Sequence, residues 1–257
     1  MRTQVLDGKR ALWYPTKKNV GGPRKFALFL PGFPKYPGIS KFTEVFLELG
    51  YDVLVPMYSG TFDSDGSFSI ENSVEDAVLW HTYLQAGAFF VSPEEKESIN
   101  VSEIILFSSS FGSLVAGLVL KKYTLDSVNK CVFVSPLWDM SSYKLEEAQR
   151  NQADETSRLM DFSYPHSYRF EDKADFFGKL MGTIEIDGMD GNFLDKKKEF
   201  HVFAGNKDTV TPPAMAAALN ASYASSQLHS LDGGHSSRID MAAFKEIMTR
   251  ICSDQQG

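Results

Sequence analysis

The sequence predicts an α/β protein with a mostly parallel central sheet of about eight strands and helices on both faces. Short, continuously apolar runs such as Phe26–Leu30, Tyr51–Val55 and Lys130–Val134 are typical of strands whose two faces are both covered. Segments with helical periodicity lie between them, and this alternation favours parallel pairing through right-handed crossovers. Since 257 residues suit one α/β fold, we expect a single domain spanning residues 1–257.

The N-terminal half supplies the first strands and helices in order. Alternating apolar and polar positions around Asp7-Gly8 predict a hairpin, and Gly21-Gly22-Pro23 then breaks the chain. The expected elements are a hairpin over Val5–Tyr14, strand Phe26–Leu30, helix Lys41–Gly50, strand Tyr51–Val55, a loop rich in Gly, Ser and Asp over Met57–Ser69, and a helix from about Ser73 to Gln85.

The C-terminal half repeats the alternation but contains one long interruption from about Pro136 to Lys198. The expected elements are strand Glu103–Phe107, helix Gly112–Lys122, strand Lys130–Val134, then strand Glu199–Phe203, helix Pro212–Asn220, strand Gln227–Leu231 and a closing helix from about Arg238 to Cys252. The segment 136–198 is therefore an insertion within the domain.

Composition excludes several classes of partner. The net charge of −7, with no basic run longer than Lys196–Lys198, argues against nucleic-acid binding, and we expect that triplet to form a solvated turn. No apolar run approaches membrane-spanning length and the first residues lack a signal-peptide core, so we expect a soluble, cytoplasmic protein. Cys131 and Cys252 lack metal-site spacing and are expected to remain thiols. The oligomeric state does not follow from the sequence.

The stretch from Ile104 to Ser113 is the strongest functional signal, because an apolar strand breaks into small residues and restarts as a helix. A strained turn of this kind can hold a serine hydroxyl in the open beside a base. Small residues are needed two positions before and after the nucleophile, and Ser110, between Ser108 and Gly112, meets both requirements. The alternative is that Ser110 is only a polar cap at a helix start.

A carboxylate and a histidine follow Ser110 in the order that such a site requires. Asp208 comes after a predicted strand and a glycine turn, and His235 follows the paired glycines of the next loop. Asp139, after the preceding strand, is a rival for the acid. Asp232, close to His235, is better explained as a turn residue. His81, His166, His201 and His229 lack ligand-like spacing, so we expect no metal site.

With these three motifs the chain resembles the α/β-hydrolase superfamily from about Val5 to Cys252, and looks most like its serine esterase, lipase and acyl-peptidase branches. The resemblance implies a Ser110–Asp208–His235 triad and an oxyanion hole formed by the backbone N–H groups of Phe33 and Phe111. It implies no cofactor. The chain departs from the family pattern at Pro31, where histidine is frequent, and at Ser108, where glycine is frequent.

The insertion 136–198 sits where the superfamily often carries a lid over the active site. Its aromatic residues, Trp138, Phe176 and Phe177 among them, are candidates for an apolar roof over the substrate, or else form the small core of the lid itself. The loop Tyr58–Gly66 resembles the glycine-rich loop after the fourth strand of the family. It would give structural support, with Tyr58 lining the pocket.

The sequence therefore favours a serine hydrolase that cleaves a carboxylic ester or thioester of a small molecule through an acyl-enzyme. An acyltransferase or peptidase with the same triad, and a non-catalytic binding protein on the same scaffold, are the alternatives. Relatives that cleave haloalkanes or epoxides carry aspartate at the nucleophile position, so Ser110 disfavours those activities.

Overall fold

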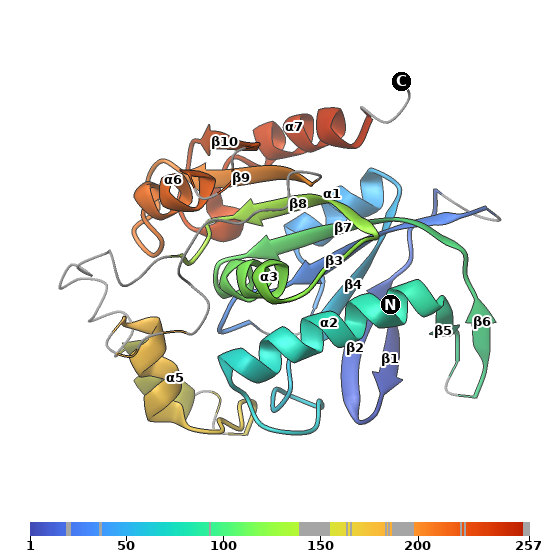
Figure 1. Cartoon of the computed structure of the whole chain (residues 1–257), viewed down its shortest axis with the longest axis horizontal. Coiled ribbons are helices and arrows are strands. Elements are labelled where there is room, and N and C mark those ends of the chain that lie inside the picture. The colour runs from blue at the N-terminus through green and yellow to red at the C-terminus, as the bar shows by residue number, and fades with distance from the viewer. Residues whose placement is uncertain are drawn as a thin grey trace.

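The computed structural model describes residues 1–18, 22–35, 38–92, 94–138, 155–162, 164, 166–182, 184, 186, 198–221, 223 and 225–253. An eight-stranded sheet lies at the centre with helices on both sides (Figure 1), which confirms the predicted α/β class. Its strand order is β1-β2-β4-β3-β7-β8-β9-β10. The pairs β1–β2 and β2–β4 are antiparallel and the other five are parallel, so the sheet is mostly parallel as expected.

The strands and helices follow the predicted order. The sheet strands are β1 (Arg2–Leu6), β2 (Lys9–Tyr14), β3 (Arg24–Leu30), β4 (Tyr51–Met57), β7 (Val101–Ser109), β8 (Val128–Val134), β9 (Glu199–Gly205) and β10 (Ser226–Leu231). The helices are α1 (Lys41–Glu48), α2 (Ile70–Ala86), α3 (Phe111–Lys122), α5 (Lys173–Leu180), α6 (Pro213–Ala221) and α7 (Met241–Ser253), with a 3₁₀ turn η1 (Ser236–Arg238) before α7.

Two local features differ from the expectation. Helix α2 begins one turn earlier than predicted, because the side chain of Ser69 accepts a hydrogen bond from the backbone N–H of Asn72 and caps the helix there. A separate hairpin of β5 (Ala88–Phe90) and β6 (Lys96–Ser98) was not predicted. Its three-residue strands are too short to show an alternating pattern.

Alternation along the strands divides the core between the two faces of the sheet. On β3, Phe26, Leu28 and Leu30 face the cluster that packs under α2, α3 and α6, whereas Ala27 and Phe29 face the cluster under α1 and α7. Both faces are apolar because both are covered, which explains the continuous apolar runs in the sequence. Because the strands β3, β7, β9 and β10 run in the same direction, their carboxyl ends lie at one edge of the sheet, where the loops that follow them come together.

The expectation for the basic triplet is wrong at Lys198, while residues 196 and 197 lie outside the described residues. Lys198 is only 7% exposed. Its Nζ donates to the carbonyl oxygens of Leu125, at 2.9 Å, and Val128, at 3.0 Å. Lys198, which directly precedes β9, therefore holds the chain at the start of β8 through two backbone carbonyl groups. The run of three lysines does not reveal this long-range contact.

Both cysteines are free thiols, with Cys131 buried in β8 and Cys252 partly buried in α7. None of the described helices is long and apolar enough to span a membrane.

Candidate active site

Ser110 occupies the sharp turn between β7 and α3, with φ +54° and ψ −123°. The turn packs closely against the loop that follows β3. A Cβ added to Gly112 would lie 2.0 Å from the carbonyl oxygen of Leu30, and one added to Gly32 would lie 3.1 Å from Cβ of Ser110. The small residues around Ser110 are therefore a steric requirement of two backbones in contact, and the strained φ turns the side chain of Ser110 out of the strand.

Three side chains from separate loops meet at this turn. Nε2 of His235 lies 3.0 Å from Oγ of Ser110, and Nδ1 of His235 lies 2.9 Å from Oδ2 of Asp208. The loops after β7, β9 and β10 supply one residue each, because parallel strands end at the same edge of the sheet. The distances suit proton transfer from the hydroxyl to an imidazole whose other nitrogen is held by the carboxylate.

Asp208 is buried and fixed from several directions. Its Oδ1 accepts from the backbone N–H groups of Val210, at 2.9 Å, and Thr211, at 3.0 Å, while Oγ1 of Thr211 lies 3.1 Å from its Oδ2. Burial opposes ionisation, but the hydrogen bond and charge of His235 together with the N–H donors outweigh it, so the pKa of Asp208 lies below its ordinary value. The carboxylate is held ionised and oriented toward His235.

The alternatives to this assignment were a capping role for Ser110 and a different acid, Asp139 or Asp232. The Ser110 side chain makes no capping hydrogen bond to α3, and Oγ of the neighbouring Ser109 lies 2.8 Å from Oγ of Ser236 instead. Asp232 forms an exposed ion pair with Lys207, with Nζ and Oδ1 2.7 Å apart. The rival acid Asp139 lies outside the described residues.

A cavity of about 440 Å³ opens beside Ser110 and His235. Phe33 and Phe111 both line it. Within the described residues the backbone N–H of Phe33 has no acceptor, and Phe111 is the first residue of α3, where an N–H has no intrahelical partner. The other lining residues are Phe29, Gly32, Pro34, Lys35, Phe42, Ser109, Leu137, Thr156, Phe177, Leu180, Val210, Thr211, Met215, Ser236, Ser237 and Arg238.

The candidate pocket aromatics of the insertion take different positions. Phe177 lines the cavity. Phe176 is buried with its ring centroid 5.0 Å from that of Phe33 and 4.9 Å from that of Phe68, and Trp138 is buried against Gly117 of α3. The rings thus pack onto the main domain, so the described aromatics neither line the cavity as a set nor form a core private to the insertion.

The glycine-rich loop is hydrogen-bonded to the insertion that carries these aromatic rings. Backbone hydrogen bonds tie it to the insertion, from Phe68 N to Arg169 O at 2.7 Å and from Arg169 N to Gly60 O at 2.7 Å. Tyr58, a candidate pocket residue, does not line the large cavity. It lines a smaller one of about 30 Å³, and its hydroxyl donates to the carbonyl oxygen of Pro31 at 3.2 Å. Tyr58 therefore supports the loop that carries Phe33.

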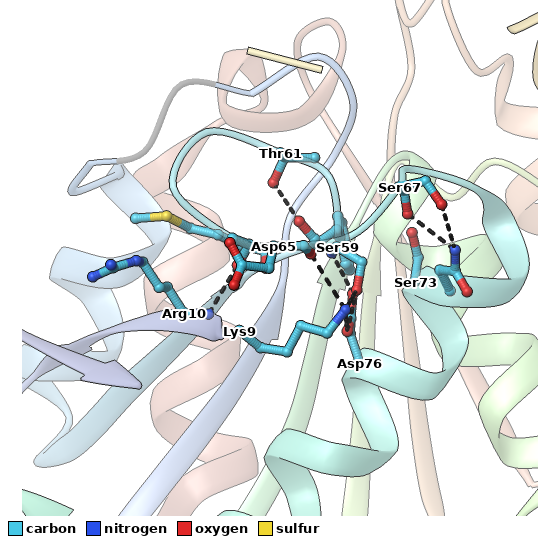
Figure 2. Close-up of polar contacts among 12 residues, drawn as sticks. Lys9, Arg10, Ser59, Thr61, Asp65, Ser67, Ser73 and Asp76 are labelled. Carbon is cyan, nitrogen blue, oxygen red and sulfur yellow. Dashed lines mark hydrogen bonds and ion pairs between the residues drawn. The ribbon is translucent and has the colours of Figure 1, made fainter. Parts of the chain in front are cut away.

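A buried ionic cluster anchors the same loop, as Figure 2 shows. Ser59 donates through its backbone N–H and its hydroxyl to the carboxylate of Asp76 on α2, and Nζ of Lys9 donates to Oγ of Ser59 while lying 3.9 Å from Asp76. The cluster joins the first hairpin, the loop and α2. It gives the loop a rigid base, which no local sequence pattern predicts.

Several residues of the site were not predicted from the sequence. Thr211 is the clearest, since its Oγ1 donates to the carbonyl oxygen of Ser135 at 3.0 Å and also contacts Asp208 and His235. The available signal is Asp208 itself, because aspartate side chains in turns commonly hydrogen-bond the backbone that follows them. Lys35 and Arg238, which line the cavity, carry no motif at all.

Three of the remaining histidines contact polar side chains within the fold. His81 is buried on α2 with Nε2 2.7 Å from Oγ of Ser127, and His201 and His229 stack across β9 and β10 with their facing nitrogens 3.1 Å apart. Within the ranges that the structure describes, no group of three His, Cys, Asp or Glu residues could hold a metal ion.

Burial of His81 predicts a loss of stability in acid. Burial, reinforced by the charge of Lys198, lowers the pKa of His81 from 6.5 to about 4. Between about pH 6.5 and pH 4, the unfolded chain therefore binds a proton at His81 that the folded protein does not bind. The free energy of unfolding falls over this range as the pH drops, by roughly 3 kcal/mol at most for this group.

Urea unfolding at pH 7, 5 and 4 measures this loss, and a His81→Gln protein should lose less stability over that range. Equal losses in wild type and His81→Gln, with the exposed His166→Gln as control, would contradict the assignment.

Solved structures with a similar fold are numerous. Est1E from Butyrivibrio proteoclasticus, solved with ferulic acid bound, is 16% identical over 99% of both chains, with a TM-score of 0.66. The Pyrococcus furiosus esterase Pf2001 is 16% identical over 97% of this chain and 88% of its own, with a TM-score of 0.63. MGS-MChE2, an alpha/beta hydrolase enzyme from a lagoon-sediment metagenome, is 15% identical over all of both chains, with a TM-score of 0.59. No family model matches the sequence. No curated protein matches it either.

Proposed function

Because the chain has the α/β-hydrolase fold, we propose that it is a serine hydrolase that cleaves a carboxylic ester or thioester of a small molecule. The observation that carries the proposal is the hydrogen-bonded series from Ser110 through His235 to Asp208, with 3.0 Å and 2.9 Å between the atoms concerned. The series stands at the edge of a cavity large enough for a small acyl or aromatic group.

In the first half of the reaction, Oγ of Ser110 attacks the carbonyl carbon while its proton passes to Nε2 of His235. The negative charge on the carbonyl oxygen is stabilised by the backbone N–H groups of Phe33 and Phe111. Collapse of the tetrahedral intermediate breaks the bond to the alcohol or thiol, which takes the proton from Nε2 and departs. The acyl group stays on Ser110 as an ester.

In the second half, water attacks the acyl-enzyme and gives a proton to Nε2 of His235. Collapse then returns that proton to Oγ of Ser110 and releases the carboxylic acid. Throughout, Asp208 keeps the proton of Nδ1 in place and stabilises the imidazolium. The segment 136–198 acts as the lid, and Phe177 and Leu180 supply part of the apolar wall against which the acyl group lies.

The test combines a fluorophosphonate probe with p-nitrophenyl esters of increasing acyl length. We expect stoichiometric labelling, and turnover that is highest for acyl chains that fit about 440 Å³. Labelling should map to Ser110 and persist in a Ser109→Ala protein, because the hydroxyl of Ser109 faces Ser236 rather than His235. A protein that is folded, binds small esters and yet neither labels nor turns over would be a binding protein on this scaffold.

A further inference from the structure

The charge of the cavity wall is opposite to that of the chain. The chain carries a net charge of −7. The described residues that line the cavity nevertheless include two full cations, Lys35 and Arg238, and neither aspartate nor glutamate. Apolar side chains make up most of the remaining wall, so the two cations are its charged features.

None of the described residues neutralises either cation. Among the described residues, no ion pair or hydrogen bond engages Nζ of Lys35 or the guanidinium of Arg238. Other lysines of comparable exposure have partners. Nζ of Lys179, on the insertion, lies 2.7 Å from Glu71 and 2.8 Å from Asp175. Burial lowers the pKa of Lys35, which means that its charge is poorly solvated where it stands.

Hydrogen bonds hold the backbone of both residues near the proposed reacting groups. The hydroxyl of Tyr168 accepts from the backbone N–H of Lys35 at 2.9 Å and lies 3.1 Å from its carbonyl oxygen, two residues beyond Phe33. On the other side, Arg238 N donates to the carbonyl oxygen of His235 at 3.1 Å and Arg238 O accepts from Gly234 N at 3.2 Å. Lys35 and Arg238 thus line the same cavity as Ser110, one from the loop after β3 and the other from the turn after His235.

We propose that the substrate carries an anionic oxygen group, a carboxylate or a phosphate, which Lys35 binds inside the cavity and Arg238 attracts at its exposed mouth. The proposal rests on the proposed function, because it names the class of ester that this site takes. An anion placed against a half-buried, unpartnered ammonium gains more than one at the surface, where water screens the charge. Lys35 therefore sets specificity, and Arg238 contributes mainly to encounter.

The test uses ester pairs that differ in charge but not in the reacting group. Mono-p-nitrophenyl adipate against p-nitrophenyl hexanoate places a carboxylate on the acyl side. On the alcohol side, 4-acetoxybenzoate against 4-acetoxybenzamide offers a carboxylate, and 4-acetoxyphenyl phosphate against 4-methoxyphenyl acetate offers a phosphate. We expect kcat/KM to favour the charged member of at least one pair by about tenfold or more, and the pair concerned identifies the anion and its side.

Variants assign the preference to its residues. In Lys35→Gln the charged-to-neutral ratio should fall about tenfold, whereas in Arg238→Gln it should fall about twofold and lose its dependence on salt. Lys17→Gln is the matched control, because it removes one exposed charge at the opposite edge of the sheet and should leave the ratio unchanged. No preference in any pair, or a preference that survives in Lys35→Gln, would overturn the proposal.

A binding measurement separates this proposal from the triad chemistry. Calorimetry with the Ser110→Ala protein reads, without turnover, the affinity for the charged and the neutral member of each of the three ester pairs. Tighter binding of a charged member, reduced by Lys35→Gln, supports the anion site even if no ester is hydrolysed. Equal affinities in all three pairs refute it even if neutral esters are hydrolysed.

Discussion

A Ser110→Ala protein is expected to lose about 10⁶-fold in ester turnover. The substitution deletes the oxygen that lies 3.0 Å from Nε2 of His235, and no other described hydroxyl stands in that position. The cavity and the backbone donors stay in place, so a small residual rate above the uncatalysed reaction should remain. Turnover of p-nitrophenyl acetate, corrected for spontaneous hydrolysis, measures the effect.

The same variant should be folded. The hydroxyl of Ser110 is partly exposed and its single hydrogen bond in the described structure is to His235, while alanine tolerates the positive φ about as well as serine does. We therefore expect the urea midpoint to stay within experimental error. Fluorophosphonate labelling should vanish in Ser110→Ala and persist in Ser109→Ala. Labelling that persists in Ser110→Ala would refute the assignment of the nucleophile.

An Asp208→Asn protein is expected to lose about 10⁴-fold in turnover while remaining folded. Two backbone N–H groups, of Val210 and Thr211, point at Oδ1, so the amide oxygen of asparagine must take that position. The amide nitrogen then replaces Oδ2 and faces Nδ1 of His235. An N–H donor there makes Nδ1 an acceptor, which moves the imidazole proton to Nε2, and Nε2 can no longer take the proton of Ser110.

The control for this substitution is Asp232→Asn, which also removes one negative charge near His235 but breaks an ion pair with Lys207 that lies on the surface. It should change turnover less than about twofold, as surface pairs contribute little. Near-normal turnover in Asp208→Asn would mean that another carboxylate orients His235, and Asp139→Asn then becomes the decisive variant.

The sequence predicts what depends on local pattern. The apolar runs identify the strands of the sheet because burial on both faces needs them, and the small residues around Ser110 identify the turn because Gly112 touches the backbone of Leu30. The pairing of His235 with Asp208 could be anticipated because parallel strands end at one edge.

What the sequence does not predict depends on contacts between distant segments. The burial of Lys198 requires the carbonyl groups of the turn before β8, and the support of Pro31 by Tyr58 requires a loop 27 residues away. The position of Phe176 depends on Phe33 and Phe68, which come from other parts of the chain. Periodicity predicts that such residues are buried but not against which partner.

The strand order has a consequence for partly unfolded molecules. Asp208 and His235 both follow the last two strands, β9 and β10, which end the sheet and attach to the rest of it through β8 alone. Edge segments of a sheet commonly open before its centre does. A molecule in which β9 and β10 have detached would still present Ser110 on its turn, but without a base. The proposed activity would therefore report the docking of β9 and β10 specifically, and we expect it to decline under mild denaturant before the central strands unfold.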